Sequence, residues 1–122
     1  MNDSSKLGLI VVAHGSKLEA SNDEIRLMAT TLKALDTNNT WIAEAFLECG
    51  HPTIPRTLMD ASLKGINTLK ILPYFITAGV HVKRDITAIV VQAQQEYPEM
   101  TIELLPHLGS LPNLAKFIHD AL

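Results

Sequence analysis

The stretch Leu7-Gly-Leu-Ile-Val-Val-Ala13 decides the fold, and it leads directly into His14-Gly-Ser16. An unbroken apolar run of this length is typical of a strand that is buried on both faces of a sheet. We therefore expect residues 7–13 to form the central strand of a parallel sheet, with a polar loop at its carboxyl end.

Helical and strand patterns alternate along the rest of the chain. Apolar residues at helical spacing predict a first helix that starts at the capping-box sequence 21–24 or at the similar sequence 16–19. Gly65 is the expected end of the second helix, and Ser110 is the expected cap of the last helix. The expected later strands are residues 41–47, 68–72 and 100–105, and residues 74–82 are the expected loop before the third helix, which opens at Asp85.

This order of strands and helices predicts an α/β fold. Strands that alternate with helices form parallel sheets with helices on both faces. We expect a three-layer sandwich with a four-stranded parallel sheet, as one domain that spans residues 1–122. In such sheets, ligands bind at the carboxyl ends of the strands.

Composition excludes several classes of partner. The 122 residues are 47% hydrophobic and 19% charged, which favours a folded core over disorder. The net charge of −3 lacks the basic excess of nucleic-acid-binding proteins. The sequence has neither the pattern of a membrane span nor that of a signal peptide, and the single cysteine agrees with a reducing compartment. We expect a cytoplasmic protein with no nucleic-acid or membrane partner.

Four polar residues follow the four predicted strands and should meet at one edge. They are His14, Glu48, His81 and His107. Two imidazoles and a carboxylate can hold a divalent first-row metal with open coordination positions, or they can move protons near neutral pH. Each residue alone also fits a structural or solvated role, and His107 is the least compelling of the four.

Other residues near these loops have two readings each. Gly15 and Ser16 could form a nest of backbone N–H groups for an anion, although the glycines and lysine of a phosphate loop are missing. Cys49, beside Glu48, could be a soft metal ligand, but the favoured interpretation is a buried, inert thiol. Lys17, Lys83 and Arg84 are solvated charges or a basic rim that receives an acidic ligand.

Together these motifs resemble the class II tetrapyrrole chelatases, and above all the short CbiX-type sirohydrochlorin cobaltochelatases. The resemblance covers nearly the whole chain in the same order. Its motifs are Val12-Ala-His-Gly-Ser-Lys17, Ala45-Phe-Leu-Glu48, Pro73-Tyr-Phe75, Gly79-Val-His81 with Asp85-Ile86, and Pro106-His-Leu-Gly109.

The resemblance implies ATP-independent insertion of a divalent metal into sirohydrochlorin, in cobalamin or sirohaem biosynthesis. By this resemblance, His14 and His81 are the expected metal ligands and proton acceptors. Glu48 is expected to assist them. Asp85, one helical turn after His81, is the expected acceptor that orients the imidazole. The substrate's acetate and propionate groups give Ser16 and the basic rim a binding role. The implied metal is cobalt, with iron or nickel as alternatives, and no other cofactor is expected.

Two other functions remain open at this point, and the chain length adds an expectation about assembly. A noncatalytic metal- or tetrapyrrole-binding protein needs only the two histidines, and a phosphate-binding enzyme would use the turn at residues 15–16. Longer members of the family resemble two such units fused around a cleft. We therefore expect this chain to form a homodimer with an isologous interface.

Overall fold

The computed structural model describes residues 6–122, and a four-stranded sheet lies at its centre. All neighbouring strands are parallel, in the order β2-β1-β3-β4, so β1 is central as expected. The parallel α/β fold predicted from the sequence is confirmed. The strands are β1 (Leu7–Ala13), β2 (Trp41–Phe46), β3 (Thr68–Pro73) and β4 (Thr101–Leu104).

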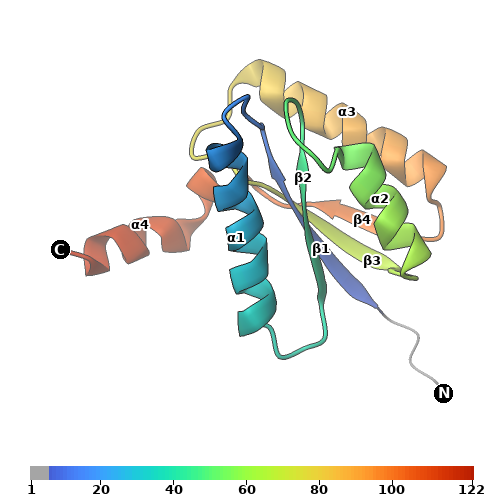
Figure 1. The fold of residues 1–122 in the computed structure, drawn as a ribbon, viewed down its shortest axis with the longest axis horizontal. Coiled ribbons are helices and arrows are strands. Elements are labelled where there is room, and N and C mark those ends of the chain that lie inside the picture. Colours follow the sequence, from blue (N-terminus) through green and yellow to red (C-terminus); the bar gives the residue numbers. More distant parts are fainter. Residues whose placement is uncertain (1–5) are drawn as a thin grey trace.

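Helices cover the two faces of the sheet unequally. Figure 1 shows α1 on one side of the sheet and α2 and α3 on the other, whereas α4 projects away from the body. The helices are α1 (Glu19–Leu35), α2 (Ile54–Leu63), α3 (Val80–Glu96), α4 (Pro112–Asp120) and the short 3-10 helix η1 (Leu108–Ser110). Within residues 6–122, no helix is both long and apolar enough to cross a membrane.

The main core lies between the sheet and the pair α2 and α3. Ile10 of β1 and Leu69 of β3 are fully buried there, together with Leu58 of α2 and Ile86 of α3. The alternation of strand side chains sends Val11, which is also fully buried, to the opposite face. An unbroken apolar run in β1 is therefore required because both of its faces are covered.

Helix starts differ from the sequence expectations. α1 begins at Glu19 after Leu18, which makes no side-chain cap, so neither predicted capping box forms. Leu111 rather than Ser110 precedes α4, and the Ser110 hydroxyl instead donates to the carbonyl of His107 at 2.7 Å. The end of α2 is as expected, because Gly65 adopts a φ of +77°.

The largest boundary difference is at α3. Its first residue is Val80, five positions before the expected start, because Gly79 is extended and acts as the residue before the helix. His81 therefore lies in the first turn of a helix and not in a loop. Its neighbours are now fixed by helical spacing, which matters for the site.

Candidate metal and proton-transfer site

The carboxyl edge of the sheet gathers the three principal candidate residues. His14 follows β1 directly, Glu48 lies two residues after β2, and His81 stands at the start of α3, after β3. The connections from β1 and β3 leave in opposite directions along the sheet, so this edge is the switch point where ligands bind in open parallel sheets. The structure thus places the three residues at the edge that the sequence predicted.

Backbone hydrogen bonds hold the His14 and Glu48 loops together. The N–H of Leu47 donates to the carbonyl of Ala13 at 2.9 Å, and the N–H of Glu48 donates to the carbonyl of His14 at 2.8 Å. Gly15 has a φ of +96°, and a Cβ there would lie 1.7 Å from the carbonyl oxygen of Glu48. Only glycine permits this approach, which explains the His-Gly pair.

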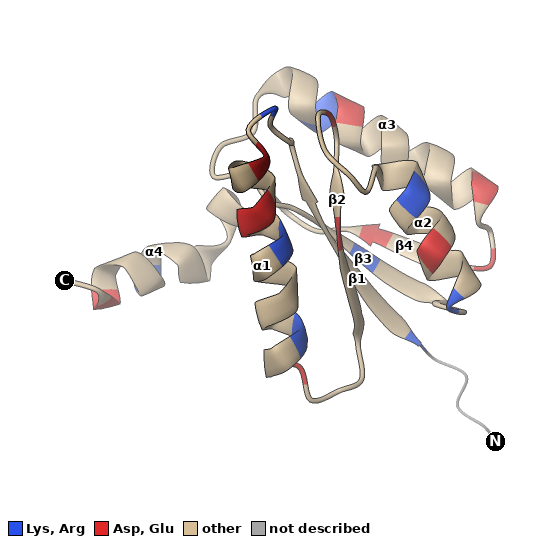
Figure 2. Cartoon of the chain, in the orientation of Figure 1, with Lys and Arg blue, Asp and Glu red and all other residues tan. Residues whose placement is uncertain are grey.

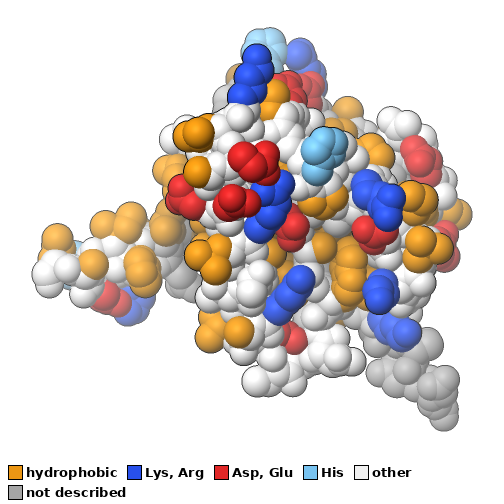
Figure 3. All heavy atoms as spheres, in the orientation of Figure 1, with side chains coloured by type: hydrophobic (Ala, Val, Ile, Leu, Met, Phe, Trp, Pro, Cys, Tyr) orange, Lys and Arg blue, Asp and Glu red, His pale blue; other side chains and the backbone are white. Residues whose placement is uncertain are grey.

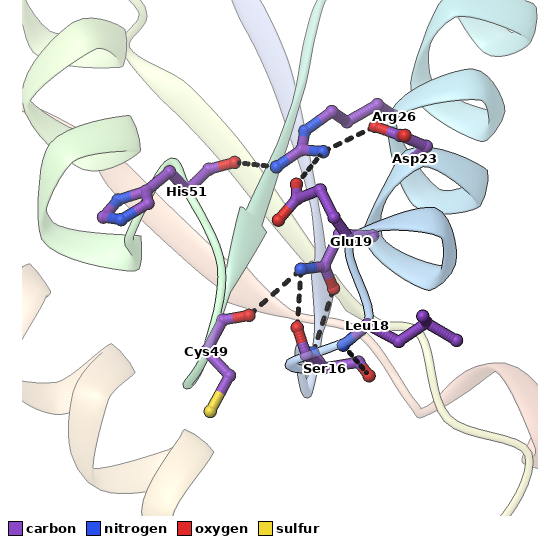
Figure 4. A network of polar contacts seen from close by, with 8 residues as sticks. Ser16, Leu18, Glu19, Asp23, Arg26, Cys49 and His51 are labelled. Atoms are coloured by element: carbon purple, nitrogen blue, oxygen red, sulfur yellow. Dashed lines mark hydrogen bonds and ion pairs between the residues drawn. The ribbon is translucent and has the colours of Figure 1, made fainter.

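The side-chain amide of Asn22, in α1, joins the same two loops by hydrogen bonds. Its side chain is 1% exposed. Its Oδ1 accepts from the N–H of Ser16 at 2.9 Å, while its Nδ2 donates to the carbonyls of Ser16 at 2.8 Å and Cys49 at 3.0 Å. Figure 4 labels Ser16 and Cys49, whose backbone groups this amide joins. One amide therefore satisfies three backbone groups next to the candidate residues.

Arg26 forms a second tie between α1 and the loop after β2. Its guanidinium donates to the carboxylates of Glu19 and Asp23 and, at 2.7 Å, to the carbonyl of His51 (Figure 4). It also stacks over the ring of Phe46 at 5.3 Å. The hydrogen bonds that Arg26 donates to the two carboxylates, first to Glu19 and then to Asp23, raise its pKa above the ordinary value. The loop that carries Glu48 is thus fixed at both ends.

The ring of His14 has its free lone pair on Nε2. Its Nδ1 lies 3.3 Å from the carbonyl of Gly15, and because a carbonyl only accepts, Nδ1 carries the proton. The lone pair of the neutral ring is then on Nε2, which lies 3.9 Å from Oε2 of Glu48. The two side chains are 51% and 63% exposed, so solvent and ligands reach them. This pair can hold a cation or pass a proton.

His81 has the opposite arrangement. Nη2 of Arg84 lies 2.8 Å from Nδ1 of His81, and because a guanidinium only donates, Nδ1 is the acceptor. The proton of the neutral ring is then on Nε2. The expected contact with Asp85 does not occur among residues 6–122, since the spacing of three residues brings Arg84 to the ring instead.

The remaining candidates occupy different surroundings. The N–H and hydroxyl of Ser16 are both engaged, the first by Asn22 and the second by the N–H of Leu18. The expected anion nest therefore lacks this N–H as a free donor. Lys17 is exposed. Lys83 and His107 line a hollow of about 380 Å³ between α3 and the end of β4.

Two expectations about the site need correction. Cys49 is exposed, with a φ of +45°, and is not the buried thiol expected from the sequence, because the turn after Glu48 faces solvent. In the described part of the chain, no three His, Cys, Asp or Glu side chains gather into a group that could hold a metal ion. The edge supplies the pair His14 and Glu48, and His81 stands apart with Arg84.

Charges around this edge are mixed. Figure 2 shows acidic and basic positions interspersed along α1, α2 and α3. Figure 3 shows histidine and basic side chains together at the top of the view. The second observation agrees with a local basic rim on a chain whose net charge is −3.

Asn22 and Arg26 were not singled out from the sequence. Asn22 lies inside the Ser21–Glu24 capping-box pattern, which suggested a local role, whereas its amide contacts Cys49, 27 residues away. In the sequence, Arg26 resembles the many other charged residues that lie on the surfaces of helices. No periodicity or motif signal could have identified either contact, since both depend on which loops the sheet brings together.

Comparisons with known proteins place this geometry in a family context. The sequence model of the CbiX family matches residues 8–122. The sirohydrochlorin cobaltochelatase of Methanothermobacter thermautotrophicus is 28% identical over 89 residues, which are 73% of this chain and 61% of that protein. The chain thus spans less than two thirds of the length of this curated relative.

Two solved structures share the fold. A CbiX protein from Marinobacter aquaeolei VT8 aligns with a TM-score of 0.81 and 25% identity, over 94% of this chain and 92% of its own. The sirohydrochlorin chelatase SirB from Bacillus subtilis subspecies spizizenii, solved in complex with cobalt, aligns with a TM-score of 0.81 and 23% identity. That alignment covers 94% of this chain but 49% of SirB, so the fold described here accounts for half of the longer protein.

Proposed function

We propose that this chain, which belongs to the CbiX family, is a chelatase that inserts a divalent metal ion into sirohydrochlorin without ATP. The observation that carries the proposal is the pair of His14 Nε2 and Glu48 Oε2, 3.9 Å apart and exposed at the carboxyl edge of the sheet. An imidazole lone pair beside a carboxylate suits both tasks of the reaction, which are to hold the metal and to remove protons.

The charge balance of metal insertion fixes how many protons the protein must remove. A divalent metal that enters the macrocycle replaces two pyrrole protons, so charge is conserved when two protons leave. His14 holds the metal or accepts a proton at Nε2, and Glu48 accepts or relays a proton. His81 is the second metal ligand and proton acceptor in this proposal, once Arg84 releases its Nδ1.

The basic side chains supply recognition of the substrate. Lys17, Lys83 and Arg84 are exposed near the same edge and can donate to the carboxylates of an acidic tetrapyrrole. Ser16 is a weaker candidate because its N–H and hydroxyl already have partners. The metal we propose is cobalt, with iron and nickel as alternatives, because divalent first-row ions bind similar nitrogen and oxygen ligands.

We further propose a cytoplasmic homodimer. While Arg84 occupies His81, one chain offers only His14 and Glu48, whereas a bound metal ion usually takes at least three protein or substrate ligands. A second copy, together with the macrocycle nitrogens, would complete the coordination and enclose the substrate.

Anaerobic mixing tests the activity. Purified protein is combined with sirohydrochlorin and Co²⁺, Fe²⁺ or Ni²⁺ in turn, and the visible absorption of the macrocycle is followed against a protein-free control. We expect faster insertion with the protein, and a loss of at least tenfold in His14→Ala and in His81→Ala. His119→Gln, on α4 and outside the site, is the matched control. Insertion no faster than in buffer with all three metals would overturn the proposal.

A noncatalytic binding protein is the alternative, and Glu48 separates it from an enzyme. In Glu48→Gln a chelatase loses insertion rate while it still binds the metal, because the amide cannot accept the proton. A protein that only carries the metal or the tetrapyrrole would show binding without any rate enhancement in the wild type.

A further inference from the structure

His81 and Arg84 form a pair at the start of α3 that closes His81 to a metal ion. Nη2 of Arg84 donates to Nδ1 of His81 at 2.8 Å. A neutral imidazole has one lone pair in the plane of the ring, and this hydrogen bond occupies it. A metal ion therefore reaches His81 only after Arg84 has moved away.

Arg84 differs from the other two arginines because it has no carboxylate partner. Arg26 pairs with two acidic side chains of its own helix, and Arg56 pairs with Asp60 at 3.3 Å. Within residues 6–122, no carboxylate lies within ion-pair distance of Arg84, not even that of Asp85, the next residue. The exposed guanidinium thus keeps its capacity to bind an anion.

The start of α3 is positively charged. Its first turn contains no acidic residue, and Lys83 and Arg84 come before its first acidic residue, Asp85. The N-terminal end of a helix has a partial positive charge, so basic side chains there are unfavourable unless an anion lies nearby. This charge adds to the attraction of Arg84 for a negatively charged group.

Exposed apolar side chains lie close to Arg84 in the chain. Val80 precedes Arg84 by one helical turn and is 78% exposed, and Ile76, in the segment before α3, is 64% exposed. Figure 1 shows the start of α3 at the same end of the molecule as the turns that follow β1 and β2. A ligand that suits these neighbours has an apolar body with carboxylates at its rim, which is the chemistry of an acidic tetrapyrrole.

We propose that a carboxylate of the bound tetrapyrrole takes Arg84 away from His81 and so frees Nδ1 for the metal. Arg84 is then a positioning residue, because it acts on the metal through His81. The inference rests on the proposed function and adds an order to it. The edge offers its second imidazole only when the macrocycle is present, and a metal ion on its own meets His14 and Glu48.

A carboxylate is a stronger partner for Arg84 than the ring of His81. A guanidinium and a carboxylate form two parallel hydrogen bonds and attract each other as opposite charges, whereas a neutral imidazole accepts one hydrogen bond. Nη2 belongs to both pairs of N–H groups that a carboxylate can engage in this way, so the ring obstructs at least one pair. The exchange requires only that the exposed Arg84 side chain turns, because no other hydrogen bond or ion pair within residues 6–122 holds it.

The two ligands should therefore respond in opposite directions to the loss of Arg84. Removal of the guanidinium frees His81 for a metal ion, but it takes a carboxylate partner away from the tetrapyrrole. A residue that only bound the substrate would affect the tetrapyrrole alone. Because coupling between two ligands is reciprocal, the tetrapyrrole and the metal should each strengthen the binding of the other.

Titration of metal-free sirohydrochlorin tests the proposal without insertion. Its affinity for the wild type, His81→Ala, Arg84→Ala and the double variant is measured anaerobically from the absorption of the macrocycle. We expect His81→Ala to bind sirohydrochlorin about fivefold more tightly, because the carboxylate no longer has to displace the ring. Arg84→Ala should weaken binding, and in its presence the gain from His81→Ala should vanish. A gain that persists in the double variant would overturn the proposal.

The same cycle with Lys83→Ala is the matched control. Lys83 carries the same charge on the preceding residue, and no hydrogen bond joins it to His81 within residues 6–122. Lys83→Ala should weaken sirohydrochlorin binding by the same factor with and without His81→Ala. Equal coupling of His81 to Lys83 and to Arg84 would contradict the exchange. All three side chains are exposed, and circular dichroism verifies that the variants fold.

The ring of His81 reports the exchange directly. Proton–nitrogen NMR correlation spectra at constant pH distinguish an imidazole nitrogen that accepts a hydrogen bond from one that does not. We expect saturating metal-free sirohydrochlorin to move the Nδ1 signal of His81 toward its position in unliganded Arg84→Ala. A signal that stays in place while sirohydrochlorin is bound would show that the carboxylate leaves the ring bonded, and the proposal would fail.

These outcomes separate the inference from the proposed function. A wild type that does not bind sirohydrochlorin would overturn both. If sirohydrochlorin binds but His81→Ala gives no gain in affinity, only the release of His81 by the substrate is overturned. Insertion activity is measured separately and does not enter either result.

Discussion

At the scale of single residues, the two histidines of the edge are held in opposite tautomers. The carbonyl of Gly15 keeps the proton of His14 on Nδ1, and the guanidinium of Arg84 keeps the proton of His81 on Nε2. His14 therefore presents a free lone pair at Nε2, whereas the lone pair of His81 is already in use. Since a metal ion needs a lone pair, Arg84 competes with the metal for His81.

Removal of Arg84 should therefore strengthen metal binding. In Arg84→Ala we expect Co²⁺ to bind about five times more tightly, because the metal no longer has to displace a hydrogen bond at His81 that is worth about 1 kcal/mol. Titration of the protein against a chromophoric chelator, at constant pH and without tetrapyrrole, measures the affinity.

Lys83→Ala is the matched control for this experiment. It removes the same charge from the preceding residue, and no hydrogen bond joins Lys83 to His81 within residues 6–122. Equal gains in the two variants would contradict competition at the ring, and so would a gain that persists when His81→Ala is added to Arg84→Ala.

Residue positions at the edge could be predicted, but their contacts could not. His14, Glu48 and His81 follow parallel strands, and topology alone sends such residues to one end of the sheet. Whether Arg84 or Asp85 reaches the ring of His81 depends on where α3 begins. That start is set by the backbone of Gly79, which the sequence pattern did not reveal.

At the scale of elements, the site depends on how α1 braces two loops. Asn22 joins the loop after β1 to the loop after β2 through three hydrogen bonds, and its side chain is almost fully buried. Buried backbone groups that lose their partners destabilise a protein, so the amide is both a structural tie and a spacer between His14 and Glu48.

Replacement of this amide should affect stability and the site together. In Asn22→Ala we expect the free energy of unfolding to fall by about 2–4 kcal/mol, because three backbone groups lose a partner. Urea denaturation measures this loss, and Co²⁺ titration of the folded variant measures the site. We expect weaker metal binding as the two loops separate.

Asn38→Ala serves as the control for the same substitution at an exposed turn. Its stability should match the wild type within about 0.5 kcal/mol. Unchanged metal affinity in Asn22→Ala would contradict the spacer role even if stability falls as expected.

Element types were more predictable than element ends. Strands were located within one residue or so, because hydrophobic periodicity reports burial directly. The start of α1 was misplaced because the hydroxyl of Ser16 accepts from the N–H of Leu18, which precedes the helix, and therefore caps no helical N–H. The apolar stripe of α4 was evident in the sequence, whereas its projection from the body was not, because a stripe does not say which surface it covers.

At the scale of the whole molecule, the sheet and the helices packed on it form one body, from which α4 projects (Figure 1). The core between the sheet and the pair α2 and α3 contains buried side chains from β1, β2 and β3, and Leu69 of β3 is 0% exposed in it. Trp41, the one tryptophan of the chain, begins β2 and packs against the same core. A single shared core predicts that these elements unfold together.

Leu69→Ala tests this cooperativity. We expect the free energy of unfolding to fall by about 2–5 kcal/mol, because truncation removes buried methyl groups and leaves a cavity. Urea transitions followed by far-ultraviolet circular dichroism and by Trp41 fluorescence should coincide in both proteins. Leu35→Ala, at a position that is 72% exposed, should change stability by less than about 0.5 kcal/mol.

The concentration dependence of the same transitions tests the proposed homodimer. Because a partner that binds only the folded state stabilises it, the midpoint should rise with protein concentration in the wild type and in Leu69→Ala alike. The loss of stability in Leu69→Ala should be the same at low and at high protein concentration. Separate transitions for the two probes would show instead that β2 and the rest of the sheet do not share one cooperative unit.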